Sequence, residues 1–364
     1  MRIISIHTMS LDQAKAMQFR LVDCIHQVIP GGEFLNQGDL GVTRAMGAPI
    51  KTRKVEEVLA KFFGTEAAIL VRGSGTGAIR NVMNVCNQPM GKIVLHDAPI
   101  YPTTKVITDS MGLQPVWVNF NDMNDPRWSD CQEVPFALVQ HSRQEIEDSY
   151  DLEAVIAKLK SVNPSMEILV DDNYTAMKAP KIGAQLGADA SAFSLFKLLG
   201  PEGVGCIVGT QDVIDKVRKI NYSGGSQVQG YEAMEALRSM VYVPVALAVQ
   251  AQQGTEVVDR LNAGELEGVK GAFIANAQSR VVLVELNQPV AKQVLKEAEK
   301  LGAAPYPVGA ESRYEIAAMF YRVSGTFLAA NPDFEDTMIR INPMRAGADT
   351  VIRVLKEALE AVKK

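Results

Sequence analysis

The amino-acid sequence predicts an α/β protein, with a large domain on a mostly parallel, seven-stranded sheet and a smaller α+β domain at its C-terminal end. Two observations carry this prediction. Short apolar runs rich in β-branched residues alternate with helical patterns between residues 67 and 209, which is typical of parallel strands buried on both faces. After a long helix predicted over 228–253, strands and helices follow one another without that alternation.

The strands of the large domain are predicted where apolar runs end in turn residues. They lie at 67–71, 92–95, 115–120, 136–140, 167–170, 191–195 and 205–209, with helices predicted at 77–87, 103–111 and 151–162. In the smaller domain, strands are predicted at 281–286, 314–323 and 337–341, and helices at 289–301 and 347–363.

The chain before the first strand has a different pattern. An amphipathic stretch runs from Leu11 to Ile29, and a helix beginning near Lys54 ends where Gly64 can act as its C-cap. We therefore expect three regions: an N-terminal helix and arm over 1–50, a large domain over 51–240 and a small domain over 241–364.

The composition narrows the class of protein. The chain has 364 residues, 47% of them hydrophobic and 22% charged, with a formal net charge of −5, which excludes disorder and a coiled coil. The lack of a basic stripe argues against a nucleic-acid partner. The longest apolar run, 241–249, is far shorter than the roughly 20 residues that span a bilayer. Four cysteines without a CxxC pair indicate reduced thiols in a cytoplasmic protein, with no disulfide or metal site.

A glycine-rich turn, Arg72-Gly-Ser-Gly-Thr-Gly77, separates the first predicted strand from a helix. Backbone N–H groups at such a junction can bind a phosphate, so Ser74, Gly75, Thr76 and Gly77 are candidate ligands. A tight turn without a ligand is the plain alternative.

The same turn also fits a nicotinamide-dinucleotide site. Gly73-x-Gly75-x-x-Ala78 satisfies the G-x-G-x-x-G/A fingerprint, and Asp97 ends the next strand, where a ribose-binding acid would lie. This alternative would make the protein an NAD-dependent dehydrogenase. Against it, the turn follows a long structured stretch of chain, whereas that fingerprint usually opens its domain.

Two further segments contain residues that could bind a ligand or act as a nucleophile. The strand at 167–170 runs directly into Asp171 and Asp172, and a carboxylate at the end of a buried parallel strand points into the ligand crevice, although it can also cap a loop. Lys197 follows Ser194 at the end of an apolar stretch. Apolar surroundings disfavour the ammonium form of a lysine and make its amine a nucleophile that can form a Schiff base. A lysine that reaches solvent at a strand end is the alternative.

In combination these segments resemble the pyridoxal-phosphate-dependent enzymes of fold type I, whose fold is like that of aspartate aminotransferase. The most similar groups are the cysteine/methionine-metabolism enzymes and the selenocysteine-synthase-like proteins. The motifs cover most of the chain and are Thr52–Gly64 (T-x-x-x-E-x-x-L-A-x-x-x-G), Ser74–Ala78 (S-G-x-x-A), Tyr101–Thr104 (Y-G-G-T), Val170–Tyr174 (V-D-N-T-F), Ser194–Lys197 (S-x-T-K) and Gly200–Gly205 (G-P-x-x-G). Their order and spacing together carry the resemblance.

The resemblance implies pyridoxal 5'-phosphate as the cofactor. Lys197 would form a Schiff base with it, and Ser194 and the glycine-rich turn would bind its phosphate. Asp171 would pair with the pyridine nitrogen, with Asp172 as the alternative.

The resemblance also implies the other contacts of the site. Tyr101 would stack on the cofactor ring, with His96 as the alternative ring. Ser226 would reach the phosphate of a second subunit in a homodimer or higher homo-oligomer, unless it only caps a helix. Arg340 would bind the α-carboxylate of the substrate, with Arg345 as the alternative.

The implied activity is a reaction at the α-amino group and Cα of a small amino acid. Elimination or replacement, by a lyase or transferase, is the preferred reaction, and a pyridoxal-phosphate-dependent aminotransferase is the alternative. The NAD-dependent dehydrogenase remains open as another class, as does a non-catalytic relative that keeps the fold as a binding module.

Overall fold

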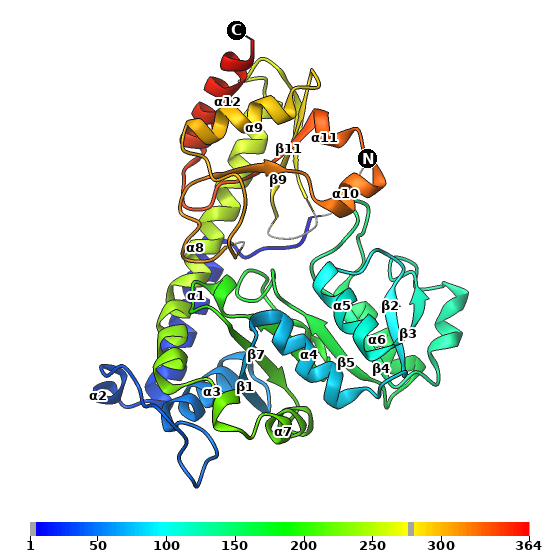
Figure 1. Ribbon diagram of the computed structural model, residues 1–364, viewed down its shortest axis with the longest axis vertical. Coiled ribbons are helices and arrows are strands. Elements are labelled where there is room, and N and C mark those ends of the chain that lie inside the picture. Colours follow the sequence, from blue (N-terminus) through cyan, green and yellow to red (C-terminus); the bar gives the residue numbers. More distant parts are fainter. Residues whose placement is uncertain (1–4, 276–279, 310, 364) are drawn as a thin grey trace. The chain divides into compact units, whose positions relative to one another are not determined.

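The structure, a computed structural model, describes residues 5–275, 280–309 and 311–363 (Figure 1). The chain divides into two compact units. The large unit consists of Asp12–Ser142 and Tyr150–Pro244, and the small unit consists of Met1–Leu11, Arg143–Ser149 and Val245–Lys364.

A 7-stranded sheet, in the order β1-β7-β6-β5-β4-β2-β3, forms the centre of the large unit as far as the structure describes it. Its strands are parallel except for β7, which runs antiparallel to both β1 and β6. The bounds are β1 (Ala67–Arg72), β2 (Lys92–His96), β3 (Gln114–Val118), β4 (Phe136–Gln140), β5 (Glu167–Asp171), β6 (Ala190–Ser194) and β7 (Val204–Gly209). The predicted mostly parallel, seven-stranded sheet is confirmed.

This strand order differs from that of a dinucleotide-binding fold. There the first strand lies in the middle of a parallel sheet. Here β1 lies at an edge and pairs antiparallel with β7. The carboxylate of Asp97, which the dinucleotide reading requires for a ribose, lies 2.7 Å from Nη1 of Arg127 in an ion pair. The topology therefore does not support an NAD site at the glycine-rich turn.

Helices cover both faces of this sheet (Figure 1). One face carries α4 (Ser74–Cys86), α5 (Pro102–Met111) and α7 (Gln211–Ile220), which bury apolar side chains against it. The other face carries α6 (Leu152–Val162) and the 3-10 helix η1 (Pro126–Cys131). The sequence did not predict α7, and α4 begins at Ser74 rather than at residue 77, so the glycine-rich segment is the first turn of this helix.

The remaining helices of the large unit precede the sheet, connect its later strands or follow it. They are α1 (Leu11–Val28), α2 (Gly31–Phe34), α3 (Ile50–Phe63), and the 3-10 helices η2 (Gly183–Leu186), η3 (Phe196–Leu198) and η4 (Gly224–Ser226). α3 packs on β1 and β7. α8 (Gly230–Asn262) continues through Pro244, where the boundary between the two units falls.

The small unit contains a 4-stranded antiparallel sheet within its described residues, in the order β10-β11-β9-β8. Its strands are β8 (Val269–Ile274), β9 (Val282–Leu286), β10 (Met319–Arg322) and β11 (Met338–Asn342), and its helices are α9 (Ala291–Lys300), α10 (Gly325–Ala330), α11 (Phe334–Thr337) and α12 (Ala348–Val362). The predicted smaller α+β domain is thus present, with α9 and α12 packed against each other.

One predicted strand of the small unit is too long. The apolar run 314–323 forms a strand only at Met319–Arg322. The preceding residues belong to a loop because the carboxylate of Glu315 accepts hydrogen bonds from the backbone N–H groups of Val308, Gly309 and Ser312. Conversely, β8 was not predicted, since its sequence is short of β-branched residues and contains a bulge between Val269 and Gly271.

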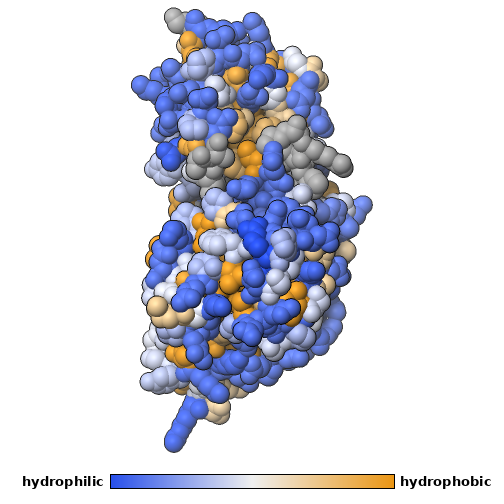
Figure 2. Space-filling view, turned by 90° about the vertical axis from the view of Figure 1, so that its right-hand side faces the viewer, coloured by the Kyte–Doolittle hydropathy of each residue, from blue (hydrophilic) through white to orange (hydrophobic). Residues whose placement is uncertain are grey.

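The surface agrees with a protein that presents polar groups to water. No helix of the described chain is long and apolar enough to cross a membrane. The face drawn in Figure 2 is largely hydrophilic, with hydrophobic residues scattered among the hydrophilic ones.

The contact between β7 and the first turn of α4 leads to a prediction on stability. A Cβ atom at Gly205 would lie 2.2 Å from the carbonyl oxygen of Ser74. We therefore expect Gly205→Ala to lower the free energy of unfolding by roughly 1–3 kcal/mol, as overpacking usually does. Urea unfolding would measure the change. Gly32→Ala is the matched control, because a Cβ there meets nothing within 4 Å. A Gly205→Ala protein as stable as this control would contradict the expected close packing.

Candidate active site

The turn between β1 and α4 is built to accept an anion. The backbone N–H groups of Gly73 and Ser74 donate to the carbonyl of Gly203, at 2.9 and 3.1 Å, which ties the turn to the segment before β7. Gly73 (φ 90°) and Ser74 (φ 57°) both lie in the left-handed region. The N–H groups of Gly75 and Thr76, in the first turn of α4, make no hydrogen bond with any other described residue. Such unpaired donors at a helix N-terminus suit a phosphate.

The structure brings the turn together with the predicted lysine motif. Oγ of Ser74 lies 2.5 Å from Oγ of Ser194, although the two serines are 120 residues apart in the chain. Ser194 ends β6, and its Oγ also accepts from the backbone N–H of Lys197 at 3.4 Å. Both serine hydroxyls and the lysine therefore lie beside the first turn of α4.

Asp171 and Asp172 point to opposite faces of the sheet, because successive side chains of a strand alternate. Leu169 packs in the cluster under α4, and Asp171 is two residues farther along β5 on that face. Val170 packs in the cluster under α6, and Asp172 follows on the same side. Asp171 is therefore the carboxylate on the face that carries the glycine-rich turn.

The carboxylate of Asp172 is fully occupied by the protein. Its Oδ1 accepts from Nδ1 of His141 and Oγ1 of Thr175, at 2.7 and 2.8 Å. Its Oδ2 accepts from the backbone N–H of Gly183 and Oγ of Ser191, at 3.0 and 2.6 Å. A carboxylate accepts about four hydrogen bonds, so Asp172, which is 0% exposed, has none left for a ligand.

Asp171, in contrast, has a carboxylate oxygen that is available to a ligand. Its Oδ1 accepts from the backbone N–H and Nδ2 of Asn173, at 3.0 and 2.7 Å, whereas its Oδ2 has no hydrogen-bond partner among the described residues. Burial raises the pKa of this carboxyl, while the hydrogen bonds from Asn173 lower it. Asp172 raises the same pKa and Lys197 lowers it. A cation or protonated ring nitrogen at Oδ2 would stabilise the ionised form.

Two tyrosines complete the surroundings of Lys197. Nζ of Lys197 lies 4.8 Å from the centre of the Tyr174 ring, a cation–π distance. The hydroxyl oxygen of Tyr174 lies 3.5 Å from that of Tyr101, which precedes α5. Tyr101 is therefore near the lysine through Tyr174. His96, the alternative ring, is partly buried, stacks on Phe120 and accepts a hydrogen bond from the backbone N–H of Phe120.

Asn173 and Tyr174 are site residues whose roles sequence reasoning missed. Both belong to the Val170–Tyr174 motif, but their contacts are with Ser194, Gly75, Lys197 and Tyr101, which are remote in the chain. Lys178 and Lys181 are the lysines nearest in sequence to Asp171, the first buried and the second exposed.

The remaining predicted residues belong to other elements of the chain. Ser226 ends η4 and does not cap α8, which begins at Gly230. Arg340 lies in the small unit with its guanidinium 4.0 Å from the Tyr321 ring centre, and its Nε donates to the carbonyl of Arg322. It is only 9% exposed, so it is not a solvent-facing arginine. Arg345, in the same unit, donates from Nη1 to Gln250.

Comparison with known proteins assigns the family. The sequence matches the family described as Aminotransferase class-V over residues 41–242. The chain belongs to that family. Residues 255–355 also match the family described as YhfS-like, C-terminal domain. The uncharacterized protein YhfS of Escherichia coli (strain K12) is 49% identical over 363 residues, and the match covers 100% of both chains.

Solved structures agree with this assignment. The crystal structure of the pyridoxal-5'-phosphate-dependent protein YhfS from Escherichia coli has a TM-score of 0.96 at 49% identity, covering 99% of this chain and 100% of that one. A methionine γ-lyase from Micromonospora echinospora has a TM-score of 0.72 at 16% identity, with 94% of this chain and 98% of that one covered. A cystathionine γ-synthase from Xanthomonas oryzae pv. oryzae has 0.72 at 15% identity, with 96% and 98% covered.

Family membership confirms the recognition, fold class and cofactor class that the motifs predicted. The protein is a pyridoxal-phosphate-dependent enzyme of fold type I with a class-V aminotransferase fold. The roles of individual residues remain predictions, which the geometry above makes specific.

The contrast between the two aspartates can be tested in the apoprotein. The raised pKa of Asp171 means that the folded state binds this proton more tightly than the unfolded state. The ionised carboxylate therefore costs no stability below the unfolded pKa of about 3.9, and its cost grows as the pH rises through the folded pKa. Asp171→Asn should then stabilise the apoprotein near neutral pH, and this gain should vanish at about pH 3, below the unfolded pKa.

Asp172→Asn is the matched variant, and we expect the opposite result. The amide has one acceptor oxygen where the carboxylate has two, so the four hydrogen bonds can no longer all be kept as they are, and the variant should lose roughly 1–3 kcal/mol of stability at neutral pH. Urea unfolding at several pH values would measure both variants. A stabilised Asp172→Asn and a destabilised Asp171→Asn would reverse the two assignments.

Proposed function

We propose that this protein acts on the α-amino group and Cα of a small amino acid, by elimination or replacement, with pyridoxal 5'-phosphate held between Lys197, Asp171 and the first turn of α4. The observation that carries the proposal is the open Oδ2 of the buried Asp171, on the same face of the sheet as the paired hydroxyls of Ser74 and Ser194.

The residues of this site offer a suitable partner for the phosphate and for the ring nitrogen of the cofactor. The unpaired N–H groups of Gly75 and Thr76, with the hydroxyls of Ser74 and Ser194, would bind the phosphate. Asp171 Oδ2 would bind the ring nitrogen. Gly77 would allow close packing of this turn, since a Cβ there would lie 2.1 Å from the carbonyl of Arg72.

Each protein group then has a chemical task. When bound, the cofactor supplies an electron sink for the charge that develops at Cα. Lys197 would bind the cofactor covalently through Nζ and later remove the proton from Cα as a general base. Asp171, ionised, would hold a proton on the ring nitrogen and so strengthen the sink. The ring of Tyr174 would keep Nζ of Lys197 in place through the cation–π contact.

Tyr101 and Arg340 would act on the substrate. Tyr101 would stack on the cofactor ring, and its hydroxyl, 3.5 Å from that of Tyr174, could donate a proton to a leaving group. Arg340 would bind the substrate α-carboxylate, with its guanidinium plane fixed by Tyr321 and by the hydrogen bond to Arg322.

Elimination or replacement is supported by the motifs shared with the cysteine/methionine-metabolism group. A methionine γ-lyase and a cystathionine γ-synthase are also among the solved structures with the same fold. Transamination is the second candidate, because the family that matches residues 41–242 is that of the class-V aminotransferases.

Lys197 is expected to carry the cofactor, because it lies beside both phosphate-binding serines. Borohydride reduction of the protein with bound cofactor, followed by peptide mass mapping, should place the label on Lys197 alone. Lys197→Ala should take up no reducible label. A label on the buried Lys178 or the exposed Lys181 would reject the assignment.

The reaction itself is tested with the same protein and a panel of small amino acids. Release of a keto acid together with ammonia or a thiol would support elimination. Conversion of the bound cofactor to its amine form, reversed by added keto acid, would establish transamination instead. A cofactor spectrum that no amino acid changes would favour a non-catalytic binding module.

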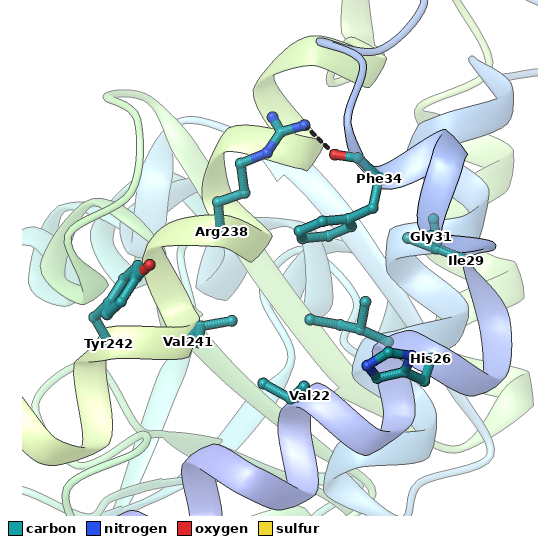
Figure 3. A pocket seen from close by; sticks show the side chains of 9 residues that line it. Val22, His26, Ile29, Gly31, Phe34, Arg238, Val241 and Tyr242 are labelled. Carbon is teal, nitrogen blue, oxygen red and sulfur yellow. Dashed lines mark hydrogen bonds between the residues drawn. The ribbon is translucent and has the colours of Figure 1, made fainter.

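We also infer a homodimer, on the basis of apolar surface around the N-terminal arm and α8. Side chains in this region of the large unit are exposed, among them Phe19, Leu35, Leu40, Tyr222 and Tyr242. A cavity of about 490 Å³ lies between α1, α2 and α8. Figure 3 shows Val22, Ile29, Phe34 and Val241 around it, with Arg238 at one side. A second copy would cover such surface. The four cysteines are free thiols, in line with a cytoplasmic location.

Shared sites would make the dimer functional. If Ser226 binds the phosphate of the partner subunit, Ser226→Ala should weaken cofactor retention several-fold, and light scattering should give a dimer mass at micromolar protein. Mixing Lys197→Ala with Ser226→Ala subunits should restore one intact site in some mixed dimers. A monomeric mass, or no gain in cofactor binding on mixing, would contradict the hypothesis that the two subunits share their sites.

A further inference from the structure

The side chain of Asn173 contacts three parts of the active site at once. Its Nδ2 donates to Asp171 Oδ1 at 2.7 Å, and its Oδ1 accepts from the backbone N–H of Ser194 at 3.0 Å. A Cβ atom added to Gly75 would lie 1.8 Å from the same Oδ1. Asn173 therefore touches the carboxylate for the cofactor ring, the strand that leads to Lys197 and the first turn of α4.

These partners determine which way the amide of Asn173 points. The backbone N–H of Ser194 can only donate, so the amide oxygen must face it. The NH2 group then faces Asp171, and its hydrogen bond joins the one from the backbone N–H of Asn173 on the same oxygen, Oδ1. Two donors on Oδ1 leave Oδ2 as the oxygen that can accept from a ligand.

The charge state of Asp171 depends on this arrangement. Both hydrogen bonds from Asn173 favour the ionised carboxylate, against the burial that raises its pKa. Two charged groups also act on this carboxyl: Asp172, on the opposite face of the sheet, raises its pKa, and Lys197 on η3 lowers it. Asn173 is the neutral member of this set and the one that also contacts α4.

We propose that Asn173 is a positioning residue, which keeps Asp171 ionised with Oδ2 directed at the cofactor ring and which makes glycine necessary at position 75. The inference rests on the proposed function, in which Asp171 binds the ring nitrogen. It gives Gly75 a role other than the approach of backbone to phosphate: its missing side chain leaves room for the amide of Asn173.

The first test uses the apoprotein of the full chain and needs no cofactor. The free energy of unfolding is measured across about pH 4–9 for the wild type and Asn173→Ala, each with and without Asp171→Asn. The difference within each pair isolates the contribution of the Asp171 carboxyl. Because Asn173→Ala removes a hydrogen bond that lowers the pKa of Asp171, we expect the cost of the Asp171 carboxyl to keep growing to higher pH, and to reach a larger final value, in the Asn173→Ala pair. Identical pH profiles in the two pairs would overturn the inference.

Asn163→Ala is the matched control for the loss of an amide. Asn163 donates to the carbonyl of Val134 and accepts from Ser165, away from Asp171. It should lower stability by a similar amount at every pH and leave the Asp171 profile unchanged. If Asn163→Ala changed that profile as Asn173→Ala does, the effect would be general and the inference would fail.

The second test measures pyridoxal-phosphate affinity and links Asn173 to Gly75. Asn173→Ala and Gly75→Ala should each weaken binding at least about tenfold. The double variant should be no weaker than the weaker single variant, because the Cβ at position 75 then has nothing to displace. If the loss of affinity in the double variant equalled the product of the two single losses, Gly75 would act independently of Asn173, and that part of the inference would be overturned.

The two tests separate this inference from the proposed function. If the wild type does not bind pyridoxal phosphate, the proposed function fails, and the apoprotein profiles still decide the role of Asn173. If Asn173→Ala does not fold, Gly75→Ala, which displaces the amide from the other side, takes its place in the apoprotein measurement with the same expected shift.

Discussion

The two neighbouring carboxylates at the end of β5, Asp171 and Asp172, point to opposite faces of one sheet, and the candidate site depends on this arrangement. The four hydrogen bonds of Asp172 join the residue after β4, the loop after β5, the first residue of η2 and β6. This anchorage fixes the backbone at the strand end. Asp171 is thereby held on the face of α4, with one oxygen unused. A single aspartate could not both hold the loop and bind a ligand, because each carboxylate has few acceptor positions.

Much of the large unit could be predicted, because buried parallel strands leave continuous β-branched runs in the sequence. The failures have physical causes. α7 buries only a narrow stripe, Val213, Ile214 and Val217, on an otherwise polar helix. The run at 314–323 looks like a strand locally, but the carboxylate of Glu315 gathers three backbone N–H groups into a loop. Such a contact has no periodic signature.

The site could be predicted where the type of a single residue, and its place in the sequence, indicate its chemistry. A lysine in an apolar stretch and an aspartate at a strand end are visible as residue types. Asn173 is not, since its importance lies in a hydrogen bond to Ser194, 21 residues away, and in the space left by Gly75. His96 is the alternative to Tyr101 for the ring that stacks on the cofactor, but its stacking on Phe120 could not be predicted from the sequence.

The small unit is interrupted in sequence, and this has a consequence for how the chain can be made and divided. Ile146, from the segment Arg143–Ser149, packs with Val281, Leu283 and Met319 in its core. On the ribosome, this short segment emerges well before the residues that cover it. The small unit can therefore complete its core only after its last strands are synthesised, and a gene fragment that starts at Val245 encodes an incomplete core.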